Sequence, residues 1–223
     1  MTEETNRLAQ AIEQLPEIQF RDLEQQRETA ELGMWIFLVT ELLLFGGLFV
    51  SYTVFRYTYP ASFAEASRHL DTVIGTVNTA ILIISSLGIA IAGYGARHAL
   101  RGRLLIGLAA AIVFGTAFMV LKGIEYYHHY LNHEFRALSF YMTVEHARAK
   151  QVFFFLYFAM TGLHSIHLTI GIVMVAAILF MAYRRTYSPD YYTPVENAGL
   201  YWHFVDMIWI FLFPLLYLID IHK

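Results

Sequence analysis

The sequence predicts an all-α membrane protein, a bundle of five transmembrane helices. Of its 223 residues, 57% are hydrophobic, whereas typical soluble domains contain about 45–50%. The mean hydropathy is +0.49. Five separate stretches are long and apolar enough to cross a hydrocarbon layer of roughly 30 Å, and none alternates apolar and polar residues as a membrane β-barrel strand does. These observations predict a chain that folds in lipid.

The five predicted spans are separated by short polar segments that contain Arg, His, Pro or Asp. They cover about residues 33–56, 72–96, 104–130, 151–182 and 199–220. The fourth is the longest, which favours a tilted helix or one that extends beyond the lipid. Small residues such as Gly88 and Gly107 predict close packing between the second and third helices. We expect residues 32–223 to form one five-helix domain.

The N-terminal segment, residues 1–31, is acidic and lacks the apolar core of a secretory signal peptide. Leu8, Ile12 and Leu15 recur at near-helical spacing and predict an amphipathic surface helix, which Pro16 would break. A solvated and partly disordered leader is the alternative. We expect this leader to be distinct from the membrane domain.

Charge and cysteine content exclude several classes of protein. A net charge of −3 gives no basis for binding nucleic acid, and the absence of cysteine removes disulfides, thiolate zinc sites and iron–sulfur clusters. Arginines are more frequent on the side of the N-terminus, notably in the turn at 97–103. The positive-inside rule therefore predicts a cytoplasmic N-terminus and an external C-terminus.

Ionisable side chains inside the predicted spans are the candidate functional residues. A charge within the membrane costs several kcal/mol, so such groups usually face a partner, water or a site. Lys122 and Glu125 are three residues apart, which predicts an ion pair on one helix face. The others are Glu41 in the first span, His164 and His167 in the fourth, and His203 and Asp206 in the last.

Residue types alone leave three interpretations of this set open. Glu125 and His128 form an E-x-x-H pattern, which di-iron carboxylate centres use, with the remaining carboxylates and histidines as further ligands. His203 paired with a histidine of the fourth span could hold a haem. Alternatively, these groups join helices through hydrogen bonds, such as one from a histidine to Asp206 or Glu41, or contact lipid head groups.

Several motifs in order along residues 31–220 resemble subunit III of the haem-copper oxidases. The last span reads Tyr-Trp-His-Phe-Val-Asp over 201–206, followed by Trp209. The fourth contains Thr-Gly-Leu-His-Ser-Ile-His over 161–167, with Gly171 beyond. The other matching positions are Trp35 to Glu41, Asn78-Thr79, Glu125-Tyr126 and Glu196.

The resemblance implies a subunit without redox groups of its own, in a bacterial cytoplasmic (inner) membrane. Such a subunit packs on the catalytic subunit I, with subunit II in the same complex, and those partners carry haem and copper. It binds structural phospholipid, sustains proton uptake during aerobic respiration and can join a larger respiratory supercomplex. The resemblance implies a buried polar network of Glu41, Asn78, Lys122, Glu125, His164, His167, Glu196, Trp202, His203 and Asp206.

Departures from the family pattern leave the type of oxidase open. Five spans replace the seven of mitochondrial-type subunits, and Lys122 stands where a neutral Gln is common. A cytochrome c oxidase is the expected complex. The same superfamily includes quinol oxidase subunits and an accessory protein of nitric oxide reductases. An independent di-iron membrane enzyme is the alternative from a different class.

Overall fold

The computed structural model describes residues 19–68, 70–131, 145–184 and 192–218, and these ranges contain helices and no strand. The helices are α2 (Leu23–Thr58), α3 (Pro60–Ser67), α4 (Thr72–Arg97), α5 (Arg101–Leu131), α6 (Glu145–Tyr183) and α7 (Thr193–Tyr217). The amphipathic helix predicted around Leu8 to Leu15 lies outside the described residues. Five of the helices are long and apolar enough to cross a membrane, which confirms the predicted all-α, five-span architecture.

Most of the helices extend past the apolar stretches that predicted them. α2 begins at Leu23, where the Asp22 side chain accepts a hydrogen bond from the backbone N–H of Gln25 and so caps the first turn. Residues 23–31 are therefore helical and continuous with the first span. Hydropathy does not detect these turns, because helical residues beyond the lipid can be polar.

The short helix α3 was not predicted, and it closes one end of the bundle. Pro60 occupies its first turn, a position where the missing N–H costs nothing. Phe63 is fully buried, with its ring centroid 5.4 Å from those of Tyr52 and Phe153. The Ser67 hydroxyl donates to the backbone carbonyl of Leu216 at 3.0 Å, which ties α3 to the end of α7.

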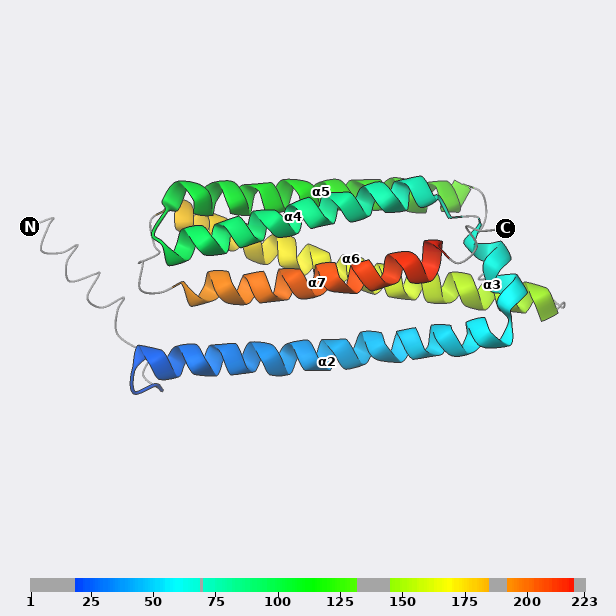
Figure 1. The fold of residues 1–223 in the computed structure, drawn as a ribbon, viewed down its shortest axis with the longest axis horizontal. Helices are drawn as coiled ribbons and strands as arrows, with labels where there is room; N and C mark the ends of the chain where they lie inside the picture. Colours follow the sequence, from blue (N-terminus) through cyan, green and yellow to red (C-terminus); the bar gives the residue numbers. More distant parts are fainter. Residues whose placement is uncertain (1–18, 69, 132–144, 185–191, 219–223) are drawn as a thin grey trace, which may run out of the picture.

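α4 and α5 lie side by side above α6 and α7, and α2 runs along the outside of this group (Figure 1). Only 11% of the most apolar stretch of α2 is buried inside the protein, compared with 33–44% of the corresponding stretches of the other spans. Large apolar side chains of α2, such as Leu43 and Val50, are exposed. The protein core therefore sits among α4, α5, α6 and α7, and α2 presents most of its surface outward.

Glycines set the close approach of α4 to α5. A Cβ at Gly107 would lie 2.5 Å from the carbonyl oxygen of Gly88 and 2.6 Å from the backbone nitrogen of Ala92. A Cβ at Gly95 would lie 2.6 Å from the backbone nitrogen of Leu104. Neither position leaves space for a side chain, so the prediction that Gly88 and Gly107 mediate close packing is confirmed.

The bundle has two polar ends, which we name by the helix termini found there. At the N-face, where α2 begins, Arg27 of α2 and Arg97 of α4 both bind Glu196 of α7, at 3.4 and 2.8 Å. At the C-face, α7 ends at Tyr217 beside α3 and the second half of α5. The polar groups between these faces are the candidate site.

Candidate functional site

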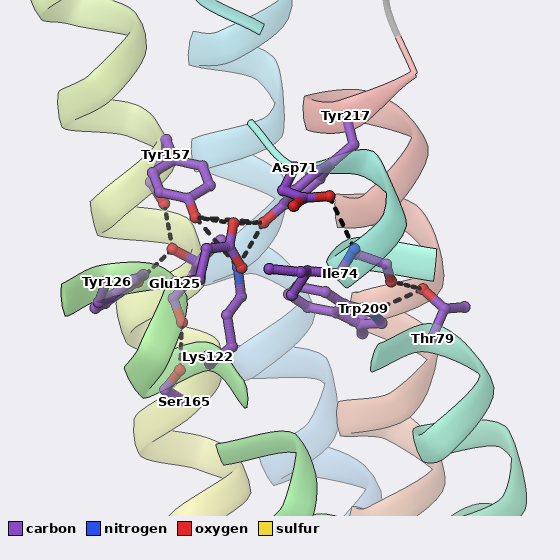
Figure 2. Close-up of polar contacts among 12 residues, drawn as sticks. Asp71, Ile74, Thr79, Lys122, Glu125, Tyr126, Tyr157, Ser165, Trp209 and Tyr217 are labelled. Atoms are coloured by element: carbon purple, nitrogen blue, oxygen red, sulfur yellow. Dashed lines mark hydrogen bonds and ion pairs between the residues drawn. The ribbon is translucent and has the colours of Figure 1, made fainter. Parts of the chain in front are cut away.

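Lys122 and Glu125 form the centre of a buried cluster near the C-face (Figure 2). Their side chains are each only 3% exposed, and Lys122 Nζ lies 2.9 Å from Glu125 Oε2. The Tyr157 hydroxyl of α6 donates to Glu125 Oε1 at 2.8 Å, and the Tyr217 hydroxyl of α7 does so at 2.5 Å. Three helices therefore meet at one ion pair, and the predicted pairing of Lys122 with Glu125 is confirmed.

The cluster is closed by hydrogen bonds and aromatic rings on all sides. Lys122 Nζ also donates to the hydroxyls of Tyr217 and Tyr157 at 2.6 and 3.2 Å. It lies 5.0 Å from the ring centroid of Trp209, within the range of a cation–π contact. A buried ion pair persists when further hydrogen bonds compensate for its desolvation, and this one meets that condition. We call Lys122, Glu125, Tyr157 and Tyr217 the lysine cage.

The second half of the E-x-x-H pattern does not join the cage. His128 is exposed at the surface of α5, whereas Glu125 points inward to Tyr157 and Tyr217. Nowhere in the described parts of the chain do three or more His, Cys, Asp or Glu side chains gather as a metal site requires. The di-iron hypothesis is therefore left without a ligand set among these residues.

Glu41 and His167 form a separate pair between α2 and α6. Glu41 Oε2 lies 2.8 Å from His167 Nε2, and His167 Nδ1 lies 2.8 Å from the carbonyl oxygen of Leu163. Because that carbonyl can only accept, Nδ1 carries a proton. The Nε2 atom faces the Glu41 carboxyl group, so the two side chains join α2 to α6.

His203 and Asp206 share a face of α7 but do not bond to each other. His203 Nδ1 lies 2.7 Å from the Ser86 hydroxyl of α4, and neither carboxyl oxygen of Asp206 has a hydrogen-bond partner in the described chain. Of the histidine-to-carboxylate hydrogen bonds considered from the sequence, the structure contains the one to Glu41 and not one from His203 to Asp206. A hydroxyl on the neighbouring helix competes successfully for His203, which spacing along α7 could not reveal.

The remaining predicted residues of the interior are packed rather than paired. His164 and Asn78 are 0% exposed and Trp202 is 1% exposed, and the polar side-chain atoms of all three lack partners within the described chain. The His164 ring lies 5.5 Å from Phe118 and 5.1 Å from Trp209, centroid to centroid. It is enclosed by aromatic rings, and His167 already binds Glu41, so neither faces His203 as a haem clamp would require.

The Trp202 ring occupies the space beside Gly171, the glycine that follows the histidine motif. A Cβ at Gly171 would lie 3.2 Å from the Trp202 ring, and one at Gly115 would lie 3.0 Å from it. The indole is therefore held between α5 and α6 by two positions without side chains. Glu196, the last predicted residue, lies apart from the interior and joins Arg27 and Arg97 at the N-face.

Three residues that complete these contacts were missed by sequence analysis. Tyr157 and Tyr217 lie within apolar runs, where their rings match the surrounding phenylalanines, and Ser86 is one of two adjacent serines in α4. The charge of Lys122 is the one available signal, because a buried ammonium group requires oxygen acceptors nearby. It does not identify the helices that supply them.

Comparison with known proteins gives a family for this arrangement. The family described as cytochrome c oxidase subunit III matches residues 18–220. The chain belongs to this family. It is 33% identical to cytochrome c oxidase subunit 3 of Thermostichus vulcanus over 194 residues, which cover 84% of this chain and 86% of that protein. It is 30% identical to quinol oxidase subunit 3 of Bacillus subtilis over 202 residues, covering 89% and 93% of the two chains.

A third relative is named for ubiquinol as its electron donor. Cytochrome bo(3) ubiquinol oxidase subunit 3 of Pseudomonas putida is 29% identical over 195 residues, which cover 85% of this chain and 86% of that protein. The chain is thus a subunit III of the haem-copper oxidases, a membrane protein that associates with other oxidase subunits. Relatives named for cytochrome c and for quinol lie at similar identity, so the family assignment covers both.

Proposed function

We propose that this subunit III belongs to a cytochrome c oxidase of the bacterial inner membrane, packs on subunit I beside subunit II, and supports proton uptake. A supporting role, rather than a catalytic one, is favoured because the buried polar groups of this chain are engaged in structural contacts. Lys122, Glu125, Glu41 and His167 are occupied by contacts between helices. The haem and copper belong to the partner subunits, and cytochrome c as the donor follows the name of the relative from Thermostichus vulcanus.

Purification from the native host tests this proposal. The tagged chain is solubilised gently, and the reduced-minus-oxidised spectrum of the associated proteins is recorded with oxygen uptake. We expect an a-type haem signal and oxygen uptake driven by reduced cytochrome c. A complex with only b-type haem and uptake driven by quinol would assign the chain to the quinol branch. Nitric oxide consumption without oxygen uptake would assign it to the reductase branch, and either result would overturn the proposal.

The chain also offers a groove that suits a structural phospholipid. This groove between α5 and α6 has a volume of about 460 Å³ and apolar walls that include Leu105, Ala109 and Phe180. Its N-face end is marked by Tyr183, whose backbone carbonyl accepts a hydrogen bond from Arg101 at 2.8 Å. The Arg184 guanidinium lies 4.4 Å from the Phe180 ring centroid. We propose that an acyl chain fills the groove and that these two arginines bind the phosphate.

Native mass spectrometry of the purified complex tests lipid retention. The double variant Arg101→Gln with Arg184→Gln removes both charges from this groove, and we expect it to lose bound phospholipid. The matched control is Arg56→Gln with Arg68→Gln, which removes two arginines near the C-face. Equal retention in both double variants would contradict the assignment of this groove.

A further inference from the structure

Asp206 is the buried carboxyl group that the proposed supporting role leaves unexplained. It is 5% exposed, lies in the middle of α7, and has no hydrogen-bond partner for either oxygen in the described chain. The Ser86 hydroxyl of α4 lies beside the Asp206 carboxyl group and is also 2.7 Å from His203 Nδ1. A carboxylate without a cation is costly in a membrane. Asp206 therefore requires either a proton or a partner.

A groove between α4 and α7 opens onto Asp206. Its volume is about 330 Å³, and its polar lining consists of Thr79, Ser86, His203 and Asp206 on otherwise apolar walls. The Thr79 hydroxyl already accepts a hydrogen bond from Trp209 Nε1 at 3.1 Å. Asp206 is thus the one polar group of this lining that has no partner within the described residues.

A second groove continues the first one toward the N-face. It has a volume of about 480 Å³, shares Ala90 and His203 with the groove at Asp206, and reaches Arg97 and Glu196. The buried Oδ1 of Asn197 lines it and has no partner in the described chain. The two grooves adjoin at Ala90 and His203, one reaching the ionic residues of the N-face and the other Asp206 in the middle of α7.

Within the described residues, no Lys or Arg side chain pairs with Asp206. α4 contributes the hydroxyls of Thr79 and Ser86. On α6 and α5, His164 and Lys122 contact the Trp209 ring, and Lys122 is already paired with Glu125. On α2, Glu41 is bound to His167 of α6. His203, on α7 itself, is the titratable neighbour that shares the groove.

We propose that Asp206 is a proton-binding site inside the membrane, which exchanges its proton with the N-face through the groove between α4 and α7. A proton from water at the N-face adds to the carboxylate and gives a neutral carboxylic acid. The neutral form tolerates the apolar walls, and release of the proton follows the same route in reverse. This inference concerns the chain's own residues and holds for either kind of oxidase.

Carbodiimide labelling of the purified complex tests the site without turnover. A carboxylic acid adds across the N=C=N bond: its oxygen bonds to the central carbon and its proton passes to nitrogen. Peptide mass spectrometry then locates the adduct. We expect lipid-soluble dicyclohexylcarbodiimide to modify Asp206 at neutral pH, with loss of the adduct at alkaline pH and in Asp206→Asn. An unmodified Asp206 at neutral pH would overturn the proposed neutral site.

A water-soluble, cationic carbodiimide tests the route from the N-face. Gly93 lines the N-face groove, and a Cβ added there meets no atom within 4 Å. Gly93→Phe places a ring on the wall of the groove from a position where the Cβ meets no atom, and we expect loss of labelling by the water-soluble reagent. The matched control is Gly123→Phe on α5, where a Cβ also meets no atom within 4 Å. Equal labelling in both variants would overturn the route.

The labelling result is independent of the proposed identity of the complex. The haem spectrum and the electron donor decide which oxidase the chain serves, and the adduct at Asp206 decides whether this site exists. A quinol oxidase with a labelled Asp206 would overturn the first proposal and support the second.

Discussion

Among single residues, the two members of the buried ion pair in the lysine cage are expected to contribute most to stability. Removing one member of such a pair leaves an uncompensated charge, whereas replacing both is often close to neutral. Lys122→Met leaves Glu125 charged among the tyrosines, and we expect a loss of about 3–5 kcal/mol of stability. Glu125→Gln has a similar effect, and the double variant recovers most of the loss. Thermal unfolding of the purified complex measures all three.

Additive losses in the double variant would contradict this account of the cage. They would mean that Tyr157 and Tyr217 stabilise each charged group independently. Recovery in the double variant, in contrast, attributes the cost of each single change to the charge that remains.

Glu41 contributes through its contact with His167, 2.8 Å from Oε2 to Nε2. Glu41→Ala leaves His167 Nε2 without its partner, a cost of about 1–3 kcal/mol for a buried polar group. We expect haem content to stay intact while thermal stability, lipid retention and sustained turnover decline. Oxygen uptake is followed over many turnovers, beside the haem spectrum. Loss of haem from the complex would show that Glu41 has more than a supporting role.

His203 and Glu41 are expected to differ in their contribution to stability. His203 is exposed, and within the described part of the chain its side chain makes one hydrogen bond, to Ser86. His203→Ala therefore costs only about 0.5–1.5 kcal/mol, measured by thermal unfolding against Ser86→Ala as the matched variant. A much larger loss in His203→Ala than in Ser86→Ala would revive the pairing of His203 with Asp206.

At the scale of elements, the contact between α4 and α5 is the least tolerant of change. A Cβ at Gly107 would meet backbone atoms of Gly88 and Ala92, and backbone cannot give way as a flexible side chain can. Gly107→Ala forces the helices apart, and we expect a loss of about 1–3 kcal/mol from overpacking. The measurement is thermal unfolding of the complex.

Gly123 provides the control for helix propensity. A Cβ there meets no atom within 4 Å, so Gly123→Ala adds only the preference of Ala for a helix, a gain of about 0.5–1 kcal/mol. Equal effects of Gly107→Ala and Gly123→Ala would show that α4 and α5 do not depend on close contact.

Sequence analysis predicted features that lie within a single helix and missed contacts that two helices make with each other. Apolar length gave the five spans, and the spacing of Lys122 and Glu125 gave their ion pair. Tyr157, Tyr217 and Ser86 come from other helices, and no spacing rule reports the rotation or height of one helix against another. The polar first turns of α2 and the short helix α3 lie outside the apolar stretches for a similar reason, because hydropathy detects lipid contact rather than helix.

At the scale of the whole molecule, the orientation in the membrane is open to direct measurement. The excess of arginine at the N-face predicts that this face is cytoplasmic. The chain contains no cysteine, so single cysteines are unambiguous probes. Gly102→Cys at the N-face and Ala61→Cys on α3 are both exposed. In intact cells, we expect a membrane-impermeant maleimide to label Ala61→Cys and not Gly102→Cys.

The opposite labelling pattern would place the N-face outside. Disrupted cells supply the control, because both cysteines then react if both are accessible. The proton route proposed for Asp206 takes its direction from this result, since it opens on the N-face.

The lysine cage also constrains the order in which the chain can be made. Tyr157 lies on α6, the next helix after Lys122, and Tyr217 lies in the last turn of α7, so both are synthesised after Lys122. While α5 leaves the translocon, its ammonium group has only Glu125, on the same helix, as a partner. The Tyr157 hydroxyl follows with α6, and the Tyr217 hydroxyl arrives only with the last turn of α7. A chain that stalls before α7 therefore lacks the Tyr217 hydroxyl, and the buried ammonium group of Lys122 is left incompletely hydrogen-bonded.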